Sequence, residues 1–484
     1  MSLLDPTLWS GKACIGGWTA TTGGTAPVVE PATGEVLERI GVATPDDISA
    51  AARAARAQTA WARTPYTERA AVLRRAGDLF TRHAEEIQQW LVREAGSIPG
   101  KAAFETSTAA QECYEAAALA SRPLGDVLPS AEPRLSLVRR VPAGVVGVIA
   151  PFNVPLILAI RSVAPALALG NAVLLKPDLR TAVSGGVTVL RVFEEAGLPE
   201  GVLHLLPGGA DAGAALVADP QVRVISFTGS TAAGRKVGAA AAEHLKRAHL
   251  ELGGNSALIV LPDADLDRAV ATAAWGSFFH QGQVCMSTGR HLVHRSIVDE
   301  YVERLAHKAD QLPVGNPAKE QVALGPIIDA GQRDKIHGLV RSSVEGGARL
   351  VAGGTYEDLF YRPTVLTEVT DASPAYAEEV FGPVAPVRAF TDLDEAVALA
   401  TASPYGLSLG ILTGDVMRGL DLAERIPTGL VHINDQTVND EAVAPFGGVA
   451  ASGTGARFGG SANIEAFTET RWITARSTQA DYPF

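Results

Sequence analysis

Residues 222–234, VRVISFTGSTAAG, are predicted to form a buried strand, a glycine-containing turn and the first turn of a helix. In this arrangement the glycines let the backbone approach a phosphate closely, while the helix N-terminus supplies N–H groups and positive potential. Gly229 and Gly234 are spaced as G-x-x-x-x-G, not as the dinucleotide-binding G-x-G-x-x-G. A plain turn between a strand and a helix is therefore an equally good interpretation of this stretch alone.

The order strand, loop, helix recurs on both sides of this stretch, which predicts parallel sheets covered by helices. The first series has strands at 144–149, 172–175, 202–205 and 222–227, with helices at 156–169, 182–196 and 209–218. The second has strands at 256–260, 291–294, 349–352, 364–367, 386–390, 407–412 and 429–433, with helices at 266–281, 296–311, 330–345 and 393–402.

The remaining segments flank these two series. A turn at 31–34 predicts a hairpin of residues 26–30 and 35–40. Thr44 and Pro45 predict the start of a helix. Ala-rich helices are expected at 44–63, 67–94 and 102–120, proline-interrupted extended chain at 122–140, and a last strand at 464–475.

Composition limits the class of protein. A chain of 484 residues is too long for one hydrophobic core, so two or three domains are expected. The net charge of −12 argues against a nucleic-acid partner, and no run of about 18 apolar residues predicts a membrane span. No secretory signal is visible, and 3 cysteines fit a reducing compartment, so a cytoplasmic protein is expected.

Four polar residues lie where chemistry is expected. Cys285 follows a polar, glycine-containing loop, Glu251 precedes two glycines, and Asn153 and Lys176 follow predicted strands. A thiol, a carboxylate base and an amide donor can together run a covalent mechanism. Each has an ordinary alternative: a buried cysteine, a helix cap, a turn asparagine and a solvated lysine. No His/Cys cluster has metal-ligand spacing, so no metal is expected.

Taken together, the motifs resemble the aldehyde dehydrogenase superfamily over essentially the full chain. The motifs that carry the resemblance are residues 151–155, 176–177, 227–234, 251–255, 281–285, 378–383, 445–448 and 452–453. The resemblance implies an α/β fold with a Rossmann-type cofactor domain, an α/β catalytic domain and a small β excursion for oligomerisation. It also implies NAD(P)-dependent oxidation of an aldehyde to a carboxylic acid.

The resemblance further assigns roles to individual residues. Cys285 is the nucleophile that forms a hemithioacetal and then a thioester, Glu251 is the general base, and Asn153 donates to the oxyanion. The cofactor-binding residues are expected to be Lys176, Arg180, Gly229, Ser230, Gly234, Leu252, Glu379 and Phe381, with NAD as the cofactor.

One departure from the family pattern concerns the cofactor. Many relatives carry a glutamate two residues after the proline that follows Lys176, whereas this chain has Leu179, between Asp178 and Arg180. Loss of an acidic group removes repulsion against a 2′-phosphate, and Arg180 could attract one. We therefore hypothesise that NADP is accepted as well as NAD.

The substrate is expected to be an aromatic, benzaldehyde-like aldehyde. Residues 431–441 and 176–181 resemble the benzaldehyde and vanillin dehydrogenase branch, and Val154 is small where relatives often have an aromatic residue. The expected pocket residues are Phe152, Val154, Arg161, Phe278 and Val284. The alternatives are an aliphatic aldehyde or semialdehyde substrate, a CoA-acylating dehydrogenase, which Glu251 disfavours, and a non-catalytic relative.

The expected domains are a cofactor domain (1–121 and 142–250), a catalytic domain (251–443) and an oligomerisation segment (122–141 and 444–484). The strands of the last segment cannot bury themselves within one chain, which predicts a homodimer or a homotetramer.

Overall fold

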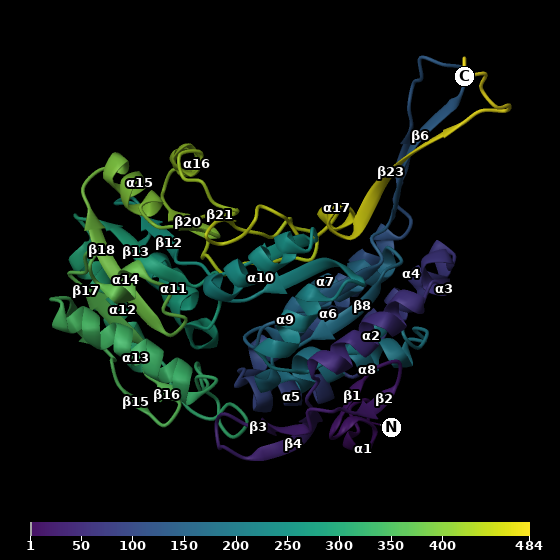
Figure 1. The fold of residues 1–484 in the computed structure, drawn as a ribbon. Coiled ribbons are helices and arrows are strands. Elements are labelled where there is room, and N and C mark those ends of the chain that lie inside the picture. Colours follow the sequence, from purple (N-terminus) through teal and green to yellow (C-terminus); the bar gives the residue numbers. More distant parts are fainter. Residues whose placement is uncertain (1) are drawn as a thin grey trace.

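Two large sheets and a slender projecting arm make up the structure, a computed structural model that describes residues 2–484 (Figure 1). We call the sheets the N-terminal and the C-terminal sheet. The arm consists of β5, β6 and β23, and Figure 1 shows it pointing away from both sheets, with the C-terminus near its tip.

The N-terminal sheet has the order β11-β10-β7-β8-β9-β1-β2, and its strands from β11 to β9 are parallel. Alternate residues face opposite sides: Val173 and Leu175 pack in one apolar cluster and Leu174 in another, as the two-residue period of a strand requires. The strands are β1 Lys12–Cys14, β2 Trp18–Ala20, β7 Val145–Ile149, β8 Ala172–Lys176, β9 Leu203–Leu205, β10 Val222–Thr228 and β11 Arg247–Glu251. The helices are α1 Pro6–Trp9, α2 Pro45–Ala57, α3 Ala60–Arg63, α4 Tyr66–Arg82, α5 Ala84–Ala95, α6 Pro99–Leu119, α7 Pro155–Ala168, α8 Thr188–Glu195, α9 Ala210–Ala218 and α10 Thr231–Glu243.

The C-terminal sheet has the order β14-β17-β18-β13-β12-β20-β21, parallel except for β14. Its strands are β12 Ser256–Val260, β13 Thr288–His294, β14 Arg349–Ala352, β17 Thr364–Thr367, β18 Val384–Phe390, β20 Ser408–Leu412 and β21 Leu430–Ile433. Its helices are α11 Leu266–Phe278, α12 Val298–Gln311, α13 Ala330–Glu345, α14 Pro374–Ala377, α15 Leu393–Thr401 and α16 Val416–Ala423. The predicted α/β fold with two parallel-rich sheets is confirmed.

The parallel strands of the N-terminal sheet deliver the predicted motifs to one edge. The chain leaves β7 towards Asn153, β8 ends at Lys176, β10 ends one residue before Gly229, and β11 ends at Glu251. Because the carboxyl ends of parallel strands share an edge, residues from four distant motifs come together.

The predicted helices were correct in place but wrong at several ends. The helix expected at 266–281 stops at Phe278, and the one expected at 67–94 is two helices, α4 and α5. Residues 462–467 form the short helix α17 (Ala462–Phe467), so the last strand starts only at Thr468. The start of α2 agrees with prediction: Thr44 and Asp47 form a reciprocal capping box.

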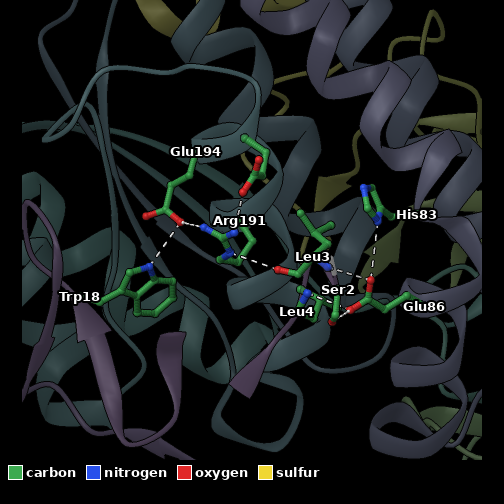
Figure 2. A network of polar contacts seen from close by, with 9 residues as sticks. Ser2, Leu3, Leu4, Trp18, His83, Glu86, Arg191 and Glu194 are labelled. Carbon is green, nitrogen blue, oxygen red and sulfur yellow. Dashed lines mark hydrogen bonds and ion pairs between the residues drawn. The ribbon is translucent and has the colours of Figure 1, made fainter. Parts of the chain in front are cut away.

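The N-terminal segment is tied to the helices of the first sheet (Figure 2). The N–H groups of Leu3 and Leu4 donate to the Glu86 carboxylate at 2.9 and 2.8 Å. The Arg191 side chain donates to the Leu3 carbonyl at 3.1 Å and pairs with Glu194. These bonds fix the segment on α5 and α8, which no local sequence pattern predicted. The hairpin of β3 (Thr25–Val29) and β4 (Val36–Gly41) follows as predicted.

The arm pairs two segments that lie far apart in the sequence. β6 (Leu135–Pro142) runs antiparallel to β23 (Thr468–Ala475) along its whole length and to the short β5 (Gly125–Val127). Val127 and Trp472 are 76% and 62% exposed.

Within residues 2–484, no helix is both long enough and apolar enough to cross a membrane. The same part of the chain holds no group of three metal-ligating side chains.

Candidate active site

Two cavities meet at Cys285. One, of about 360 Å³, lies at the strand ends of the N-terminal sheet, and we call it the sheet-side cavity. The other, of about 430 Å³, is mostly lined by apolar side chains, and we call it the apolar cavity. Asn153, Leu158 and Cys285 line both. A thiol at such a junction can be reached by one molecule from each side.

The sheet-side cavity contains most of the predicted cofactor residues. Its wall includes Lys176, Arg180, Gly229, Ser230, Leu252, Glu379 and Phe381. Ser230 caps α10 by accepting from the Ala233 N–H at 3.3 Å, so the positive end of that helix opens on the cavity. Glu379 lies in the loop before β18 of the C-terminal sheet and accepts from the Gly254 N–H at 2.9 Å. Burial lowers the pKa of Lys176 and raises the pKa of Glu379.

Two of the predicted site residues do not lie where we expected them. Gly234 is absent from the cavity wall, and a Cβ there would lie 2.1 Å from Leu252, so this glycine makes room for Leu252. Phe152 was expected in the substrate pocket but lines the sheet-side cavity, edge-on to Phe381 with 5.8 Å between the ring centres. Its ring direction could not be read from the sequence, because the turn after β7 sets it.

Arg180 has partners that the sequence did not indicate. Its guanidinium pairs with Asp178 at 2.8 Å and with Asp329 at 2.7 Å, and lies 4.1 Å above the Phe152 ring. These two carboxylates compensate the positive charge that was expected to attract a 2′-phosphate.

A sharp turn after α11 presents Cys285 to the cavities. His280 and Gln281 both have positive φ, at 50° and 55°, and Gly282 follows at 66°. The Gln281 side chain holds this turn by donating to the carbonyls of Gly96 and Pro326, at 3.1 and 2.9 Å. A Cβ on Gly282 would lie 2.1 Å from the Gly382 carbonyl, so a side chain is excluded there. The expected helix to 281 ends early because of this turn.

The Cys285 thiol is protonated at rest. Burial, with the nearby charges of Glu379 and Glu251, raises its pKa to about 12, while the charge of Arg161 opposes this shift. A nucleophilic role therefore requires transfer of the proton to a base when substrate binds.

Asn153 lies within the same junction, buried and fixed. Its Nδ2 donates to the Gln283 carbonyl at 2.8 Å, two residues from Cys285. An amide nitrogen carries two N–H groups, so a second one remains for an oxygen bound next to the thiol.

Lys101 and Glu105 on α6 are positioning residues that the sequence reasoning missed. They form a fully buried ion pair, and Lys101 donates to the Asn153 carbonyl at 2.9 Å. Glu105 accepts from the Leu156 N–H at 3.1 Å, at the start of α7. The available signal was a lysine one residue before the helix expected at 102–120 and a glutamate within that helix, four residues apart.

Glu251 lies beside the junction, outside both cavity walls. Its Oε2 accepts from the Gly448 N–H at 3.2 Å, and its buried Oε1 has no hydrogen-bond partner among residues 2–484. Burial raises the pKa of Glu251 to about 8, against the opposing effects of Gly448, Arg161 and Arg457. A carboxyl with this pKa can exchange a proton near neutral pH.

The apolar cavity contains three of the predicted substrate residues, Val154, Arg161 and Val284. Phe278 does not reach it: this side chain is 2% exposed and packs between α11 and the C-terminal sheet, so its assignment is corrected. The next residue, Phe279, lines the cavity and stacks on Trp275 with 4.5 Å between the ring centres. Because this turn ends α11 at Phe278, the next residue, Phe279, takes the place in the cavity wall that was expected for Phe278.

Comparison with known proteins agrees with this geometry. The profile described as "Aldehyde dehydrogenase family" matches residues 18–473. A vanillin dehydrogenase of Amycolatopsis sp. is 72% identical over 100% of both chains, and the benzaldehyde dehydrogenase [NAD(+)] of Pseudomonas putida is 51% identical over 99% of this chain and 98% of its own. A crystal structure of a salicylaldehyde dehydrogenase from Pseudomonas putida G7, complexed with salicylaldehyde, has a TM-score of 0.94 at 35% identity, covering 98% of this chain and 99% of that one. The predicted family is thus confirmed: this chain belongs to the aldehyde dehydrogenase family.

Proposed function

We propose that this protein oxidises an aromatic aldehyde to its carboxylic acid with NAD, through a covalent adduct on Cys285. The observation that carries this proposal is the junction at which a polar, sheet-side cavity and an apolar cavity share Cys285 and Asn153. The two cavities suit the two reactants of a redox reaction that occurs at one sulfur atom.

The apolar cavity favours an aromatic substrate. Phe104, Trp275, Phe279 and Phe446 give it aromatic walls, which suit the flat faces of a ring. The relatives named for vanillin and benzaldehyde dehydrogenation, at 72% and 51% identity, point to the same substrate class.

The first chemical step assigned to the chain is attack by the Cys285 sulfur on the aldehyde carbon, in which the thiol gives its proton to solvent and the carbonyl π electron pair moves to the aldehyde oxygen. The aldehyde oxygen then becomes an oxyanion, next to the Asn153 amide and the Cys285 N–H. A donor fixed before the reaction stabilises this charge without reorganising. The Lys101–Glu105 pair holds the Asn153 backbone, and the bond from Nδ2 to the Gln283 carbonyl orients its side chain.

The sheet-side cavity fits a dinucleotide cofactor. It combines a lysine donor at Lys176, a carboxylate acceptor at Glu379 and the N-terminus of α10, which are the groups that ribose hydroxyls and a pyrophosphate require. Bound NAD supplies the acceptor for the hydride that the oxidation removes. Phe152 and Phe381 lie edge-on to each other in the wall of this cavity and can limit the position of a flat ring.

The last step is hydrolysis of the thioester on Cys285. We assign the activation of water to Glu251, because its Oε1 is unused by residues 2–484 and its pKa of about 8 suits a base. The carboxylate must turn from Gly448 towards the sulfur to do so. A base for water is also the feature that separates acid formation from transfer to coenzyme A.

A panel of aliphatic and aromatic aldehydes, each assayed with NAD and with NADP, tests the proposal. We expect benzaldehyde-like substrates to have the highest kcat/KM and the carboxylic acid to form without an added thiol. Preference for short aliphatic aldehydes, or a strict requirement for coenzyme A, would overturn the substrate class or the reaction.

We also propose the domain organisation that the sequence predicted: cofactor domain 1–121 and 142–250, catalytic domain 251–443, and oligomerisation segment 122–141 and 444–484. The two sheets and the arm support it. The exposed arm favours association into a homodimer or homotetramer.

The cysteines Cys14, Cys113 and Cys285, all unpaired, are consistent with a cytoplasmic location.

A further inference from the structure

Apart from Lys101, the charged side chains that line the apolar cavity are Arg161 of α7 and Asp440 of the loop after β21, which together form one wall. The Arg161 guanidinium is paired with Asp440, lies 3.9 Å from Glu112 and sits 4.5 Å above the Phe446 ring. The two side chains are 4% and 10% exposed. An ion pair is costly to bury, so its presence beside an otherwise apolar substrate site calls for a role.

Both partners keep hydrogen-bonding capacity that the protein does not use. Nε of Arg161 and Oδ1 of Asp440 are buried and have no partner among residues 2–484. A buried donor or acceptor without a partner costs stability. An ion pair in which one donor and one acceptor have no partner can receive a ligand group that donates one hydrogen bond and accepts another.

The loop that carries Asp440 is fixed before any substrate binds. Thr437 is fully buried, and its hydroxyl contacts the Thr288 hydroxyl at 2.8 Å while its carbonyl accepts from Ser408 at 2.8 Å. The Gln436 side chain donates to the Val438 carbonyl at 2.7 Å. The Asp440 side of the wall is therefore anchored to the strands of the C-terminal sheet, as a specificity site requires.

We propose that the Arg161–Asp440 pair recognises a hydroxyl group on the ring of the substrate aldehyde. This inference rests on the proposed function and narrows it from aromatic aldehydes in general to those with a ring hydroxyl. The hydroxyl donates to the Asp440 carboxylate and accepts from the Arg161 guanidinium. The aldehyde carbon lies at Cys285, in the same cavity.

Other ring substituents fit this wall less well. A ring carboxylate meets the Asp440 carboxylate, so anionic rings are repelled. An ammonium group faces Arg161. A methoxy group accepts a hydrogen bond but donates none, and an unsubstituted ring leaves both wall residues unused.

The first test compares substrates on the unchanged enzyme. For 3- and 4-hydroxybenzaldehyde we measure kcat/KM against the methoxy isomer with the same ring position, which also donates electrons to the ring but carries no hydroxyl proton. We expect one hydroxy isomer to exceed its methoxy counterpart by about tenfold to a hundredfold. Ratios near one for both positions would overturn the inference.

The second test uses Asp440→Asn, which keeps the size of the side chain and removes the carboxylate. The ratio of kcat/KM for the preferred hydroxy isomer over benzaldehyde is measured in both proteins, because the effect of the substituent on aldehyde reactivity cancels in that comparison. We expect the ratio to fall by about tenfold or more. The control, Glu441→Gln, removes the neighbouring exposed carboxylate and should leave the ratio unchanged.

The outcomes separate the two proposals. If benzaldehyde is oxidised but no hydroxy isomer is preferred, or if Asp440→Asn leaves the ratio unchanged, only the hydroxyl inference fails. If neither benzaldehyde nor any substituted benzaldehyde is oxidised, the proposed function fails and the inference fails with it.

Discussion

At the scale of single residues, burial sets the pH dependence of turnover. The pKa of Glu251 is raised to about 8, so the carboxyl is mostly protonated at pH 7 and its base form increases as pH rises. When hydrolysis limits turnover, kcat should rise about tenfold per pH unit below this value and level off above it. The measurement is steady-state kcat between about pH 6 and 10. A flat profile between pH 6 and 8 would remove Glu251 from this role, and Glu251→Gln should lack the inflection near pH 8.

A second residue-scale prediction concerns the cofactor. Because Asp329 and Asp178 hold Arg180, we expect NAD to be used in preference to NADP. Asp329→Asn removes one of the two carboxylates that compensate the positive charge of Arg180. This substitution should raise the ratio of kcat/KM for NADP over NAD by about fivefold, the effect of roughly 1 kcal/mol. The matched control is Asp334→Asn, an exposed carboxylate that pairs with Arg333 and should leave the ratio unchanged. An unchanged ratio in Asp329→Asn would show that Arg180 does not face the adenosine ribose.

At the scale of elements, α6 controls the oxyanion donor through its buried ion pair. Lys101→Met leaves Glu105 buried without its partner and should lower the free energy of unfolding by about 3–5 kcal/mol. The double variant Lys101→Met/Glu105→Leu should recover much of that stability but not kcat, because the bond to the Asn153 carbonyl stays lost. Chemical denaturation and steady-state kinetics measure the two effects. Full recovery of kcat in the double variant would contradict the positioning role, and exposed Gln111→Ala on the same helix serves as the control.

The elements also show what the sequence could predict. Strands β12, β14 and β17 have the predicted bounds, because runs of apolar, β-branched residues between turn residues determine them locally. The end of α11 was missed because no local signal separates a helix from the turn at His280, which contacts made by Gln281 hold in place. The site followed the same rule: Cys285 and Asn153 belong to motifs, whereas Phe278, expected in the substrate pocket, belongs to none of them and lies in the core.

At the scale of the whole molecule, the arm is expected to mediate association. Val127 and Trp472 expose large apolar surfaces on strands that form a sheet of their own. Trp472→Glu should therefore lower the mass in solution, as measured by light scattering during size-exclusion chromatography. Met417→Glu, at a residue of similar exposure (66%) on α16, should leave the mass unchanged. A chain that is monomeric before any substitution would contradict this assignment.

Turnover by the whole molecule depends on a covalent adduct at Cys285 that Glu251 resolves by hydrolysis. Its most direct test is to mix the Glu251→Gln variant with NAD and benzaldehyde, stop the reaction within a few turnovers, and analyse peptides by mass spectrometry. We predict a rapid first equivalent of NADH, slow later turnover, and the added mass of one benzoyl group on the peptide that carries Cys285. NADH formation without an acylated Cys285 peptide, or with the acyl group on Cys14 or Cys113, would contradict the mechanism.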